Sequence, residues 1–260
     1  MNVITYATSI NCPEIGFEHV LVFKTSKETI NENGEPSKNT IKRKVQIAYA
    51  GRKGMLQKYQ VFLFETECIF DHKLEPYHLL IRRLTYVFDE YFIGVAPNGI
   101  IVEVFNVEFI QYRWNKIRSK LMQEHEGEIV EQYMEEINDR VRDHDSILNY
   151  LQQLSMYGLY FNGYWNNGLP GKYFVDKEFN FEGQKHLLKE EMNVLNVSTE
   201  LAEGIVLKVS GNVLDTAKQI CINGKYQYIN GILSEAESIS VAESVKIKHS
   251  VSWVGLRKRL

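Results

Sequence analysis

The sequence has few cysteines, and their spacing excludes two classes of protein. Cys12, Cys68 and Cys221 lie far apart, and pairing any two of them would leave one thiol over. Small secreted domains need a dense disulfide framework, and zinc sites need short Cys-x-x-Cys or Cys/His spacings. Neither pattern occurs, so we interpret the three cysteines as reduced structural thiols.

The sequence also lacks a long apolar run. No stretch approaches the ~20 uninterrupted apolar residues that a membrane-spanning helix needs. Residues Met1–Phe17 lack the basic start and apolar centre of a secretory signal. We therefore expect a cytoplasmic protein without membrane insertion.

An excess of charge of one sign is missing too. The chain carries 30 basic and 33 acidic side chains, which give a formal net charge of −3. Nucleic acid is therefore not an expected partner, because no positive field would attract it. Arg257–Arg259, Lys246 and Lys248 form only a small basic group, and edge strands often carry lysine simply to prevent unwanted pairing.

Motifs for metal, nucleotide or nucleophilic chemistry do not occur. The seven histidines never form His-x-His or His-Glu-x-x-His, and there is no Gly-x-Ser-x-Gly. Gly51–Gly54 lacks the spacing of a phosphate-binding loop, and Met55 follows where a metal-binding hydroxyl would be needed. The sequence thus assigns no catalytic residue, no metal ligand and no cofactor.

Two clusters could still carry acid–base chemistry. In Asp143-His144-Asp145 a carboxylate could orient an imidazole. Neighbouring residues on a helix do not face each other, however, and the tripeptide lies where one helix should end and the next begin. Glu65, Glu67 and Asp71 alternate on or beside a strand in the manner of paired catalytic acids. A solvent-exposed strand face produces the same alternation and is commoner.

What the chain does have is apolar and aromatic material. It is 44% hydrophobic and contains 15 tyrosines and 13 phenylalanines, enough for a sizeable core with a bias toward strands. The polar stretch Lys24–Lys44, with breakers at Asn33-Gly34 and Pro36, predicts a mobile loop. Strands are predicted after it at Val45–Ala50 and Tyr59–Phe70, with Gly51–Gly54 as their turn.

The middle of the chain predicts a hairpin followed by three helices. Pro97-Asn98-Gly99 between two apolar runs indicates a hairpin over Tyr91–Asn106. Apolar residues then recur at three- and four-residue steps, which predicts amphipathic helices. Their expected ranges are Asn106–Met122, Glu128–Arg142 and Asp145–Tyr157. The segment Glu75–Tyr86 satisfies both the helix and the strand template.

The last third of the chain predicts a second β region. Phe161–Gly171 is rich in glycine and asparagine and marks the most natural boundary, dividing the chain into domains of residues 1–165 and 166–260. Beyond it we expect a short helix at Gln184–Glu191 and, from Ile205, an antiparallel meander of about four strands with a turn at Asn223-Gly224. The predicted fold class is α+β, with antiparallel β regions at both ends flanking a three-helix middle segment.

The most unusual local composition is a group of five aromatic residues within nine positions, next to backbone-permissive glycines. Aromatic side chains on a loop bring large contact area with few torsions to freeze, so they are candidate partner-binding residues. The alternative is that they plug the helical layer against the second β region. The five are Tyr157, Tyr160, Phe161, Tyr164 and Trp165.

These features favour a non-catalytic protein-binding or assembly module, such as an adaptor, a chaperone or a component of a larger machine. The expected partner is another protein or a second copy of the chain. The alternative is an enzyme acting on a small molecule or sugar, with paired carboxylates and the aromatic group as its substrate platform.

Overall fold

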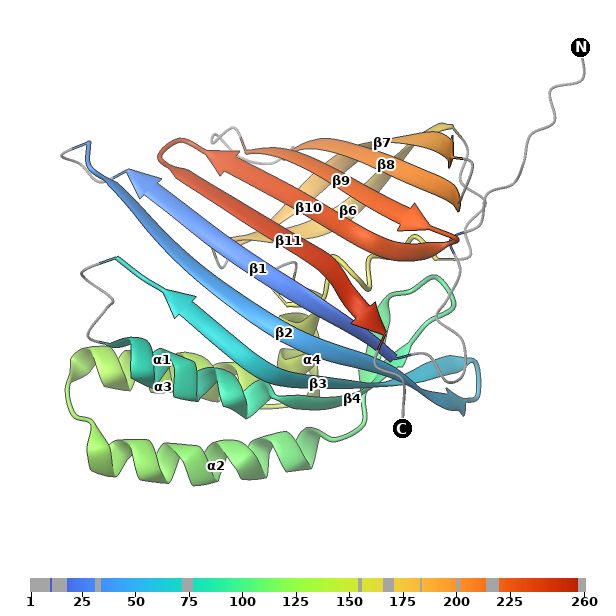
Figure 1. The fold of residues 1–260 in the computed structure, drawn as a ribbon. Helices are drawn as coiled ribbons and strands as arrows, with labels where there is room; N and C mark the ends of the chain where they lie inside the picture. The colour runs from blue at the N-terminus through green and yellow to red at the C-terminus, as the bar shows by residue number, and fades with distance from the viewer. Residues whose placement is uncertain are drawn as a thin grey trace, which may run out of the picture.

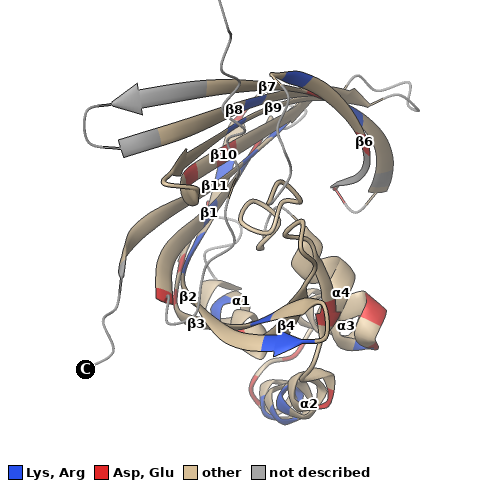
Figure 2. Cartoon of the chain, turned by 90° about the vertical axis from the view of Figure 1, so that its right-hand side faces the viewer, with Lys and Arg blue, Asp and Glu red and all other residues tan. Residues whose placement is uncertain are grey.

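Strands far apart in the sequence join into one antiparallel sheet in the computed structural model (Figure 1). The structure describes Ile10 and residues 18–30, 34–71, 77–153, 156–165, 171–182, 184–199, 202–213 and 220–256. Within these residues the sheet has eleven strands in the order β5-β4-β3-β2-β1-β11-β10-β9-β8-β7-β6. The sheet is strongly curved, and β6 turns back toward the side on which the helices lie (Figure 2).

The strands of the first half are β1 (Glu18–Ile30), β2 (Pro36–Lys53), β3 (Leu56–Ile69), β4 (Glu90–Val95) and β5 (Ile101–Val104). The strands of the second half are β6 (Lys172–Phe181), β7 (Gln184–Thr199), β8 (Ala202–Val213), β9 (Cys221–Ile229), β10 (Ile232–Ala242) and β11 (Val245–Leu256). The helices are α1 (His78–Thr85), α2 (Val107–Glu124), α3 (Glu128–Val141) and α4 (His144–Gln152), with a 3-10 turn at Tyr86–Phe88.

Alternation of side chains explains why the strands bury one face. On β1 Leu21 and Phe23 are buried, and their partners on β2, Val45 and Arg43, are buried with them. Each fully buried Leu, Val or Phe side chain contributes about 1.5–3 kcal/mol through removal of apolar surface from water. The concave face therefore holds the core, while lysines and glutamates alternate on the outer face.

A bulge in β3 changes which side chains face the core. Leu63 pairs with Val45, but Glu65 pairs with Lys44, so Phe64 is an extra residue. The period of two is interrupted there, and Thr66 rather than Glu65 becomes buried. Strict alternation along the predicted strand would place Glu65 on the same face as Val61 and Leu63, and the bulge ends that alternation.

The predicted fold class is wrong, because the two β regions are not separate. β1 pairs antiparallel with β11, with Phe23 opposite Val251. The main hydrophobic cluster contains residues from both ends of the chain, including Leu21, Tyr91 and Tyr226. The molecule is mostly one large sheet with four short helices in its described part, rather than two sheets around a helical middle. The proposed boundary between residues 165 and 166 stays a prediction.

The segment predicted as a mobile loop is mostly strand. Residues 24–30 belong to β1 and residues 36–44 to β2, paired from Ile30↔Pro36 to Lys24↔Lys42. The sequence misleads because both faces of this hairpin are polar near its tip. Gly34 and Glu35 precede β2, and residues 31–33 of the expected loop lie outside the described part of the chain.

The three predicted helices are present, although the predicted fold class is wrong. α2 begins after Asn106 and buries Ile110, Trp114 and Leu121. α3 buries Val130, Met134, Ile137 and Val141, which recur at helical spacing. α4 begins at His144, one residue before the expected range, with Asp143 as its N-cap, and it ends at Gln152. The ambiguous segment after residue 75 forms helix α1 in its described part. No helix among the described residues is long and apolar enough to cross a membrane.

Two turn predictions have opposite outcomes. The hairpin over Tyr91–Asn106 is confirmed as β4 and β5. The turn at Asn223-Gly224 is wrong, because both residues lie inside β9. The chain reverses instead at Asn230-Gly231, where both residues have positive φ (52° and 77°). Asn-Gly occurs at both places, and only the strand register selects between them. The helix expected at Gln184–Glu191 is also wrong, since this segment starts β7.

Candidate ligand-binding pocket

A pocket of about 630 Å³ lies between the concave face of the β1–β2 hairpin and helices α1, α3 and α4. Figure 2 shows α1, α3 and α4 on the concave side of the curved sheet. The volume falls within the range of about 300–1,000 Å³ that is usual for small-molecule sites. The pocket therefore has the size of a ligand site.

The helical wall of the pocket is apolar. Leu84, Phe88 and Ile137 line it and are buried, with 3%, 1% and 6% of their surface exposed. The ring of Tyr150 lies 4.6 Å from that of Phe88, centroid to centroid. This wall offers a surface for an alkyl chain or an aliphatic ring.

The strand floor of the pocket is polar. Alternate residues of β1 and β2 point into it, among them Thr25, Ser37 and Asn39. Asn39 accepts a hydrogen bond from the Asp71 backbone N–H at 3.0 Å, and the Ser37 hydroxyl donates to the Asp71 carboxylate. The Thr25 hydroxyl lies 3.1 Å from Nδ1 of His249 on β11. A ligand between floor and wall would meet one polar and one apolar side.

Arg43 is the innermost cation of the pocket floor. It is 7% exposed, whereas Lys27 and Arg140, which also line the pocket, are more accessible. Burial, together with the charge of Arg43, lowers the pKa of His249 to about 4, so this imidazole is neutral at pH 7. A guanidinium therefore lies near a neutral histidine at the floor of the pocket.

The mouth of the pocket is exposed and carries charges of both signs. Glu35 and Glu136 are exposed there, and Arg140 forms an ion pair with Glu136 at 3.3 Å. The guanidinium of Arg140 also lies 5.0 Å from the Tyr150 ring centroid. The mouth of the pocket therefore carries no excess of charge of one sign.

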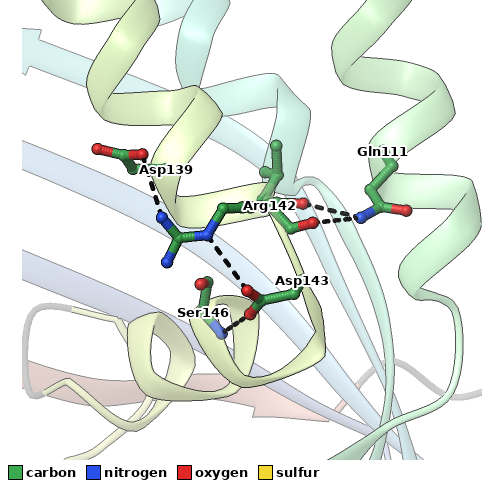
Figure 3. Close-up of polar contacts among 6 residues, drawn as sticks. Gln111, Asp139, Arg142, Asp143 and Ser146 are labelled. Atoms are coloured by element: carbon green, nitrogen blue, oxygen red, sulfur yellow. Dashed lines mark hydrogen bonds and ion pairs between the residues drawn. The ribbon is translucent and has the colours of Figure 1, made fainter.

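A polar junction joins α2, α3 and α4 (Figure 3). The Gln111 amide of α2 donates to the carbonyls of Val141 and Arg142, at 3.1 and 2.9 Å, and so caps the end of α3. Asp143 accepts the Ser146 backbone N–H at 2.8 Å and starts α4. This hydrogen bond is the main reason why the pKa of the Asp143 carboxyl is lowered.

His144 joins the same junction to the sheet. Its Nε2 lies 3.2 Å from the Glu103 carboxylate of β5 and its Nδ1 lies 3.0 Å from that of Asp145. The contact with Asp145 is the main cause of a raised His144 pKa. Asp143, His144 and Asp145 do not line the pocket, and their contacts belong to the helix junction.

The five predicted partner-binding aromatics lie in the interior. Their exposed fractions range from 1% to 5%. The Tyr160 hydroxyl lies 3.0 Å from Nδ1 of His19 on β1, and the Tyr164 hydroxyl donates to Glu190 on β7 at 3.4 Å. The loop of residues 156–165 thus connects the two halves of the concave face. Partner binding by Tyr157, Tyr160, Phe161, Tyr164 and Trp165 stays a prediction.

The three candidate acids do not meet at one site. Glu65 and Glu67 are exposed on the outer face and form ion pairs with Lys44 and Lys42, at 3.9 and 3.3 Å. Asp71 lines the pocket. The aromatic loop does not line the pocket with it, so the acids and the proposed substrate platform are separate.

The remaining chemical candidates are also accounted for by structure. Across the described residues no group of three or more His, Cys, Asp or Glu side chains could hold a metal ion. Burial raises the pKa of the Cys68 thiol, which makes it a poorer nucleophile. Lys246 and Lys248 form ion pairs with Glu28 and Glu237, and the basic tail lies outside the described residues.

Sequence reasoning missed the β1 and β2 residues of the pocket floor because they fall in the segment Lys24–Lys44, which was treated as a loop. A signal was present in the alternation of Ile41, Arg43, Val45 and Ile47. If this run is a strand, one arginine points to the same side as three apolar residues. An arginine in such a position predicts a charged side chain on the buried face of the strand.

Comparison with known proteins identifies a fold likeness and no family. No protein-family model matches the sequence, and no curated protein matches it. A solved structure described as lipid–protein interactions in lipovitellin is similar, with a TM-score of 0.57 and 9% identity. The match covers 95% of this chain and 26% of the lipovitellin chain, so this chain spans about a quarter of that length.

A second solved structure, an outer membrane channel from Pseudomonas putida F1, matches over 94% of this chain and 98% of the channel. Its TM-score is 0.21 and its identity 7%, which is too low to support any argument. The lipovitellin match therefore shows a shared sheet architecture and nothing about activity.

Proposed function

We propose that this chain is a binding protein for a small amphiphilic ligand, held between the apolar wall of α1, α3 and α4 and the polar floor of β1 and β2. The main support for this proposal is that one side of the pocket is apolar and the other polar. Leu84, Phe88 and Ile137 line the apolar side, and Thr25 and Asn39 line the polar side. Small-molecule sites combine a mostly apolar surface with a few placed polar groups that fix orientation.

The fold likeness supports the choice of lipid-like probes. The lipovitellin structure is described by its lipid–protein interactions, and its sheet resembles this one over nearly the whole chain. At 9% identity this supports the architecture alone. The polarity of the pocket in this chain is the independent reason for testing single-chain amphiphiles first.

The test is calorimetric titration with dodecanol and dodecanoate below their aggregation concentrations. We expect saturable binding of one molecule per chain. In an Ile137→Trp variant the larger ring should fill the pocket and abolish binding. Ile129→Trp is the matched control, because Ile129 lies on the same helix, is 44% exposed and does not line the pocket.

Two results would contradict the proposal. One is the absence of binding by either amphiphile to the wild-type chain. The other is equal loss of binding in Ile137→Trp and Ile129→Trp, which would mean that binding does not depend on the pocket. Circular dichroism spectra of both variants establish that they are folded.

Protein binding or self-association is the second candidate, favoured by an exposed aromatic pair on the outer face. The rings of Phe62 and Phe64 stack at 6.4 Å, and the two side chains are 40% and 39% exposed. Lys44 lies 5.3 Å from the Phe64 ring centroid. Surface aromatics are favourable contact residues. Loss of a stoichiometric partner in a Phe62→Ser/Phe64→Ser variant would support this candidate, and unchanged association would exclude this surface.

A further inference from the structure

The two edges of the sheet differ in length and in what covers them. At one edge, β5 has four residues, and side chains of α4 bond to its backbone. The Gln152 amide donates to the Ile101 carbonyl at 2.7 Å, and the Val104 backbone N–H donates to Nε2 of His144 at 3.4 Å. Short edge strands and covering helices are ways in which proteins prevent unwanted strand pairing. This edge is therefore blocked by α4.

The other edge strand, β6, has ten residues and pairs with β7 alone in the described part of the chain (Figure 2). The register between β6 and β7 has no bulge, and it continues to the pair in which the Val194 backbone N–H donates to the Gly171 carbonyl at 2.9 Å. In an antiparallel ladder every second residue bonds to the same neighbouring strand. The backbone N–H and C=O groups of Lys172, Phe174 and Asp176 therefore point away from β7, toward the open edge.

The same three residues carry their side chains on the outer face of β6. Lys172 and Asp176 are exposed, and Phe174 is 58% exposed. Tyr173 and Val175 point to the opposite face, where they are partly buried and pack against the main core cluster. The core thus holds β6 by its inner face, while its outer face presents a large aromatic side chain between a cation and an anion along the strand.

The charged groups around Phe174 come from β6 and β7. Lys172 forms an ion pair with Glu191 at 2.8 Å, and the ammonium groups of Lys172 and Lys189 each lie 5.6 Å from the Phe174 ring centroid. Lys189 is also the strand partner of Asp176. Lysines on an edge strand discourage pairing with a strand that carries no opposite charge. A strand that pairs with β6 must therefore bring an acidic residue to Lys172.

We infer that β6 is a self-association edge, which pairs antiparallel with β6 of a second copy of this chain about a two-fold axis at Phe174. In this register Phe174 lies opposite its own copy, and Lys172 of each chain lies opposite Asp176 of the other. On the inner face Tyr173 lies opposite Val175. Opposite charges, aromatic pairs and aromatic–β-branched pairs are the cross-strand combinations that stabilise antiparallel strands.

The backbone supports the same arrangement. A two-fold axis at Phe174 places the outward N–H and C=O groups of Phe174 opposite those of its copy, as a hydrogen-bonded pair. Lys172 and Asp176 then form the next hydrogen-bonded pair on either side. Such an interface is isologous, so it closes at two chains and leaves no open edge for a third.

The other registers centred on this part of β6 are less favourable. An axis at Tyr173 places Phe174 opposite Lys172, and an axis at Val175 places Phe174 opposite Asp176. An axis at Lys172 or Asp176 places like charges opposite each other, which is destabilising. The axis at Phe174 is the one of these five that pairs both the charges and the rings.

This inference is independent of the proposed ligand site. No residue of β6 is among the described residues that line the pocket. The edge is also distinct from the outer-face pair Phe62 and Phe64 on β3. Self-association at β6 therefore stands or falls separately from ligand binding.

The test is sedimentation velocity of the whole chain over a range of concentrations, in which we expect a monomer–dimer equilibrium. Lys172→Asp alone or Asp176→Lys alone should weaken the dimer about tenfold or more, because each places like charges opposite each other at both symmetry-related pairs. An equimolar mixture of the two variants should restore the dimer, because in the mixed pair every introduced charge faces one of opposite sign. Circular dichroism establishes that both variants are folded.

Phe174→Cys tests the position of the axis. Residues of a hydrogen-bonded antiparallel pair have Cα atoms about 5.5 Å apart, within the span of about 4.4–6.8 Å that a disulfide bridges. Oxidation should therefore link two chains covalently. Leu195→Cys is the matched control, because Leu195 is 44% exposed on β7, which is not an edge strand. It should give no more covalent dimer than the wild-type chain, whose own cysteines set the background.

Several outcomes would overturn the inference. A wild-type chain that stays monomeric up to about 0.1 mM has no specific self-association of useful strength, and its open edge would then suit an extended peptide of another protein. Failure of the mixed variants to restore the dimer, or equal cross-linking of Phe174→Cys and Leu195→Cys, would exclude this register. Loss of the dimer in Phe62→Ser/Phe64→Ser, with an unchanged dimer in both charge variants, would assign the interface to β3 instead.

Discussion

At the scale of single residues, the concave face is a core that accommodates polar side chains in defined places. Arg43, His19 and Glu190 are buried among apolar residues at 7%, 1% and 3% exposure. Glu190 accepts a hydrogen bond from Tyr164, and His19 contacts the Tyr160 hydroxyl. Buried polar groups are usually hydrogen-bonded. The hydroxyls of Tyr91 and Tyr157 are exceptions, because they have no hydrogen-bond partner in the described part of the chain.

Removing the hydroxyl should change the stability of the protein in opposite directions at two buried tyrosines. Tyr157→Phe should raise the free energy of unfolding by about 1 kcal/mol, because it removes a buried hydroxyl that has no partner among the described residues. Tyr228→Phe should lower it by about 1 kcal/mol, because it removes the acceptor of the Asn162 amide. Urea unfolding without ligand measures both. A destabilised Tyr157→Phe variant would mean that its hydroxyl has a partner in solution.

Two histidines should make stability depend on pH. Burial lowers the pKa of His19 and of His249 from 6.5 to about 4. Between these values the unfolded chain binds protons that the folded chain does not, so stability falls as the pH falls from 6.5 to about 4. At pH 5, which is about 1.5 units below 6.5, the lowered pKa of His19 alone should reduce the free energy of unfolding by about 2 kcal/mol.

Urea unfolding at pH 7.5 and pH 5.0 checks this. A His19→Gln variant should lose its part of the difference, since glutamine does not titrate. Equal stability of the wild-type chain at both pH values would show that these imidazoles are protonated in the folded state.

At the scale of elements, the β4–β5 turn and the aromatic loop fix each other. The Trp165 backbone N–H donates to the Asn98 carbonyl at 2.9 Å. Gly99 has a φ of +90°, and a Cβ atom there would lie 2.6 Å from the Trp165 ring. The turn therefore needs glycine both for its backbone conformation and for the close approach of the indole.

Gly99→Ala should thus be strongly destabilising, by about 2 kcal/mol or more, because positive φ and overpacking add. Gly34→Ala is the control for backbone strain alone, since Gly34 has a φ of +80° and a Cβ atom there would have no described neighbour within 4 Å. Thermal unfolding of both variants measures the difference. Equal effects would mean that contact with Trp165 does not matter.

The helices could be predicted because their signals are local. Ile110, Trp114 and Leu121 recur at helical spacing, and Asn106 marks the correct start of α2. The Asn106 side chain does not cap the first turn of the helix, because it accepts a hydrogen bond from the Phe92 backbone N–H and donates one to the Glu90 carbonyl on β4. The residue at which the helix starts can be predicted from local sequence. The hydrogen-bond partner of that residue's side chain cannot, because it depends on the position of β4 in the sheet.

At the scale of the whole molecule, the sheet order could not be predicted because its decisive pairing is not local. Thr25 and His249 are 224 residues apart, and nothing near either residue indicates the other. The pocket depends on the same pairing, because β1 is part of its floor. The aromatic group was recognised as unusual, but exposed and buried aromatics look alike in sequence.

The continuous sheet predicts one cooperative unfolding transition for the whole chain. β1 lies between β2 and β11, and the main core cluster includes residues of both halves. Calorimetric and van't Hoff enthalpies should therefore agree. The proposed division into residues 1–165 and 166–260 would instead give two transitions, and a fragment of residues 166–260 that melts cooperatively would support it.

The most direct test of the proposed binding function is a crystal structure of the chain with 12-bromododecanoate, in which anomalous scattering locates the bromine. We expect the bromine and the alkyl chain inside the pocket, between Ile137 and the β1–β2 floor. Bromine located on another surface, or an empty pocket at a ligand concentration that saturates the protein in solution, would contradict the account.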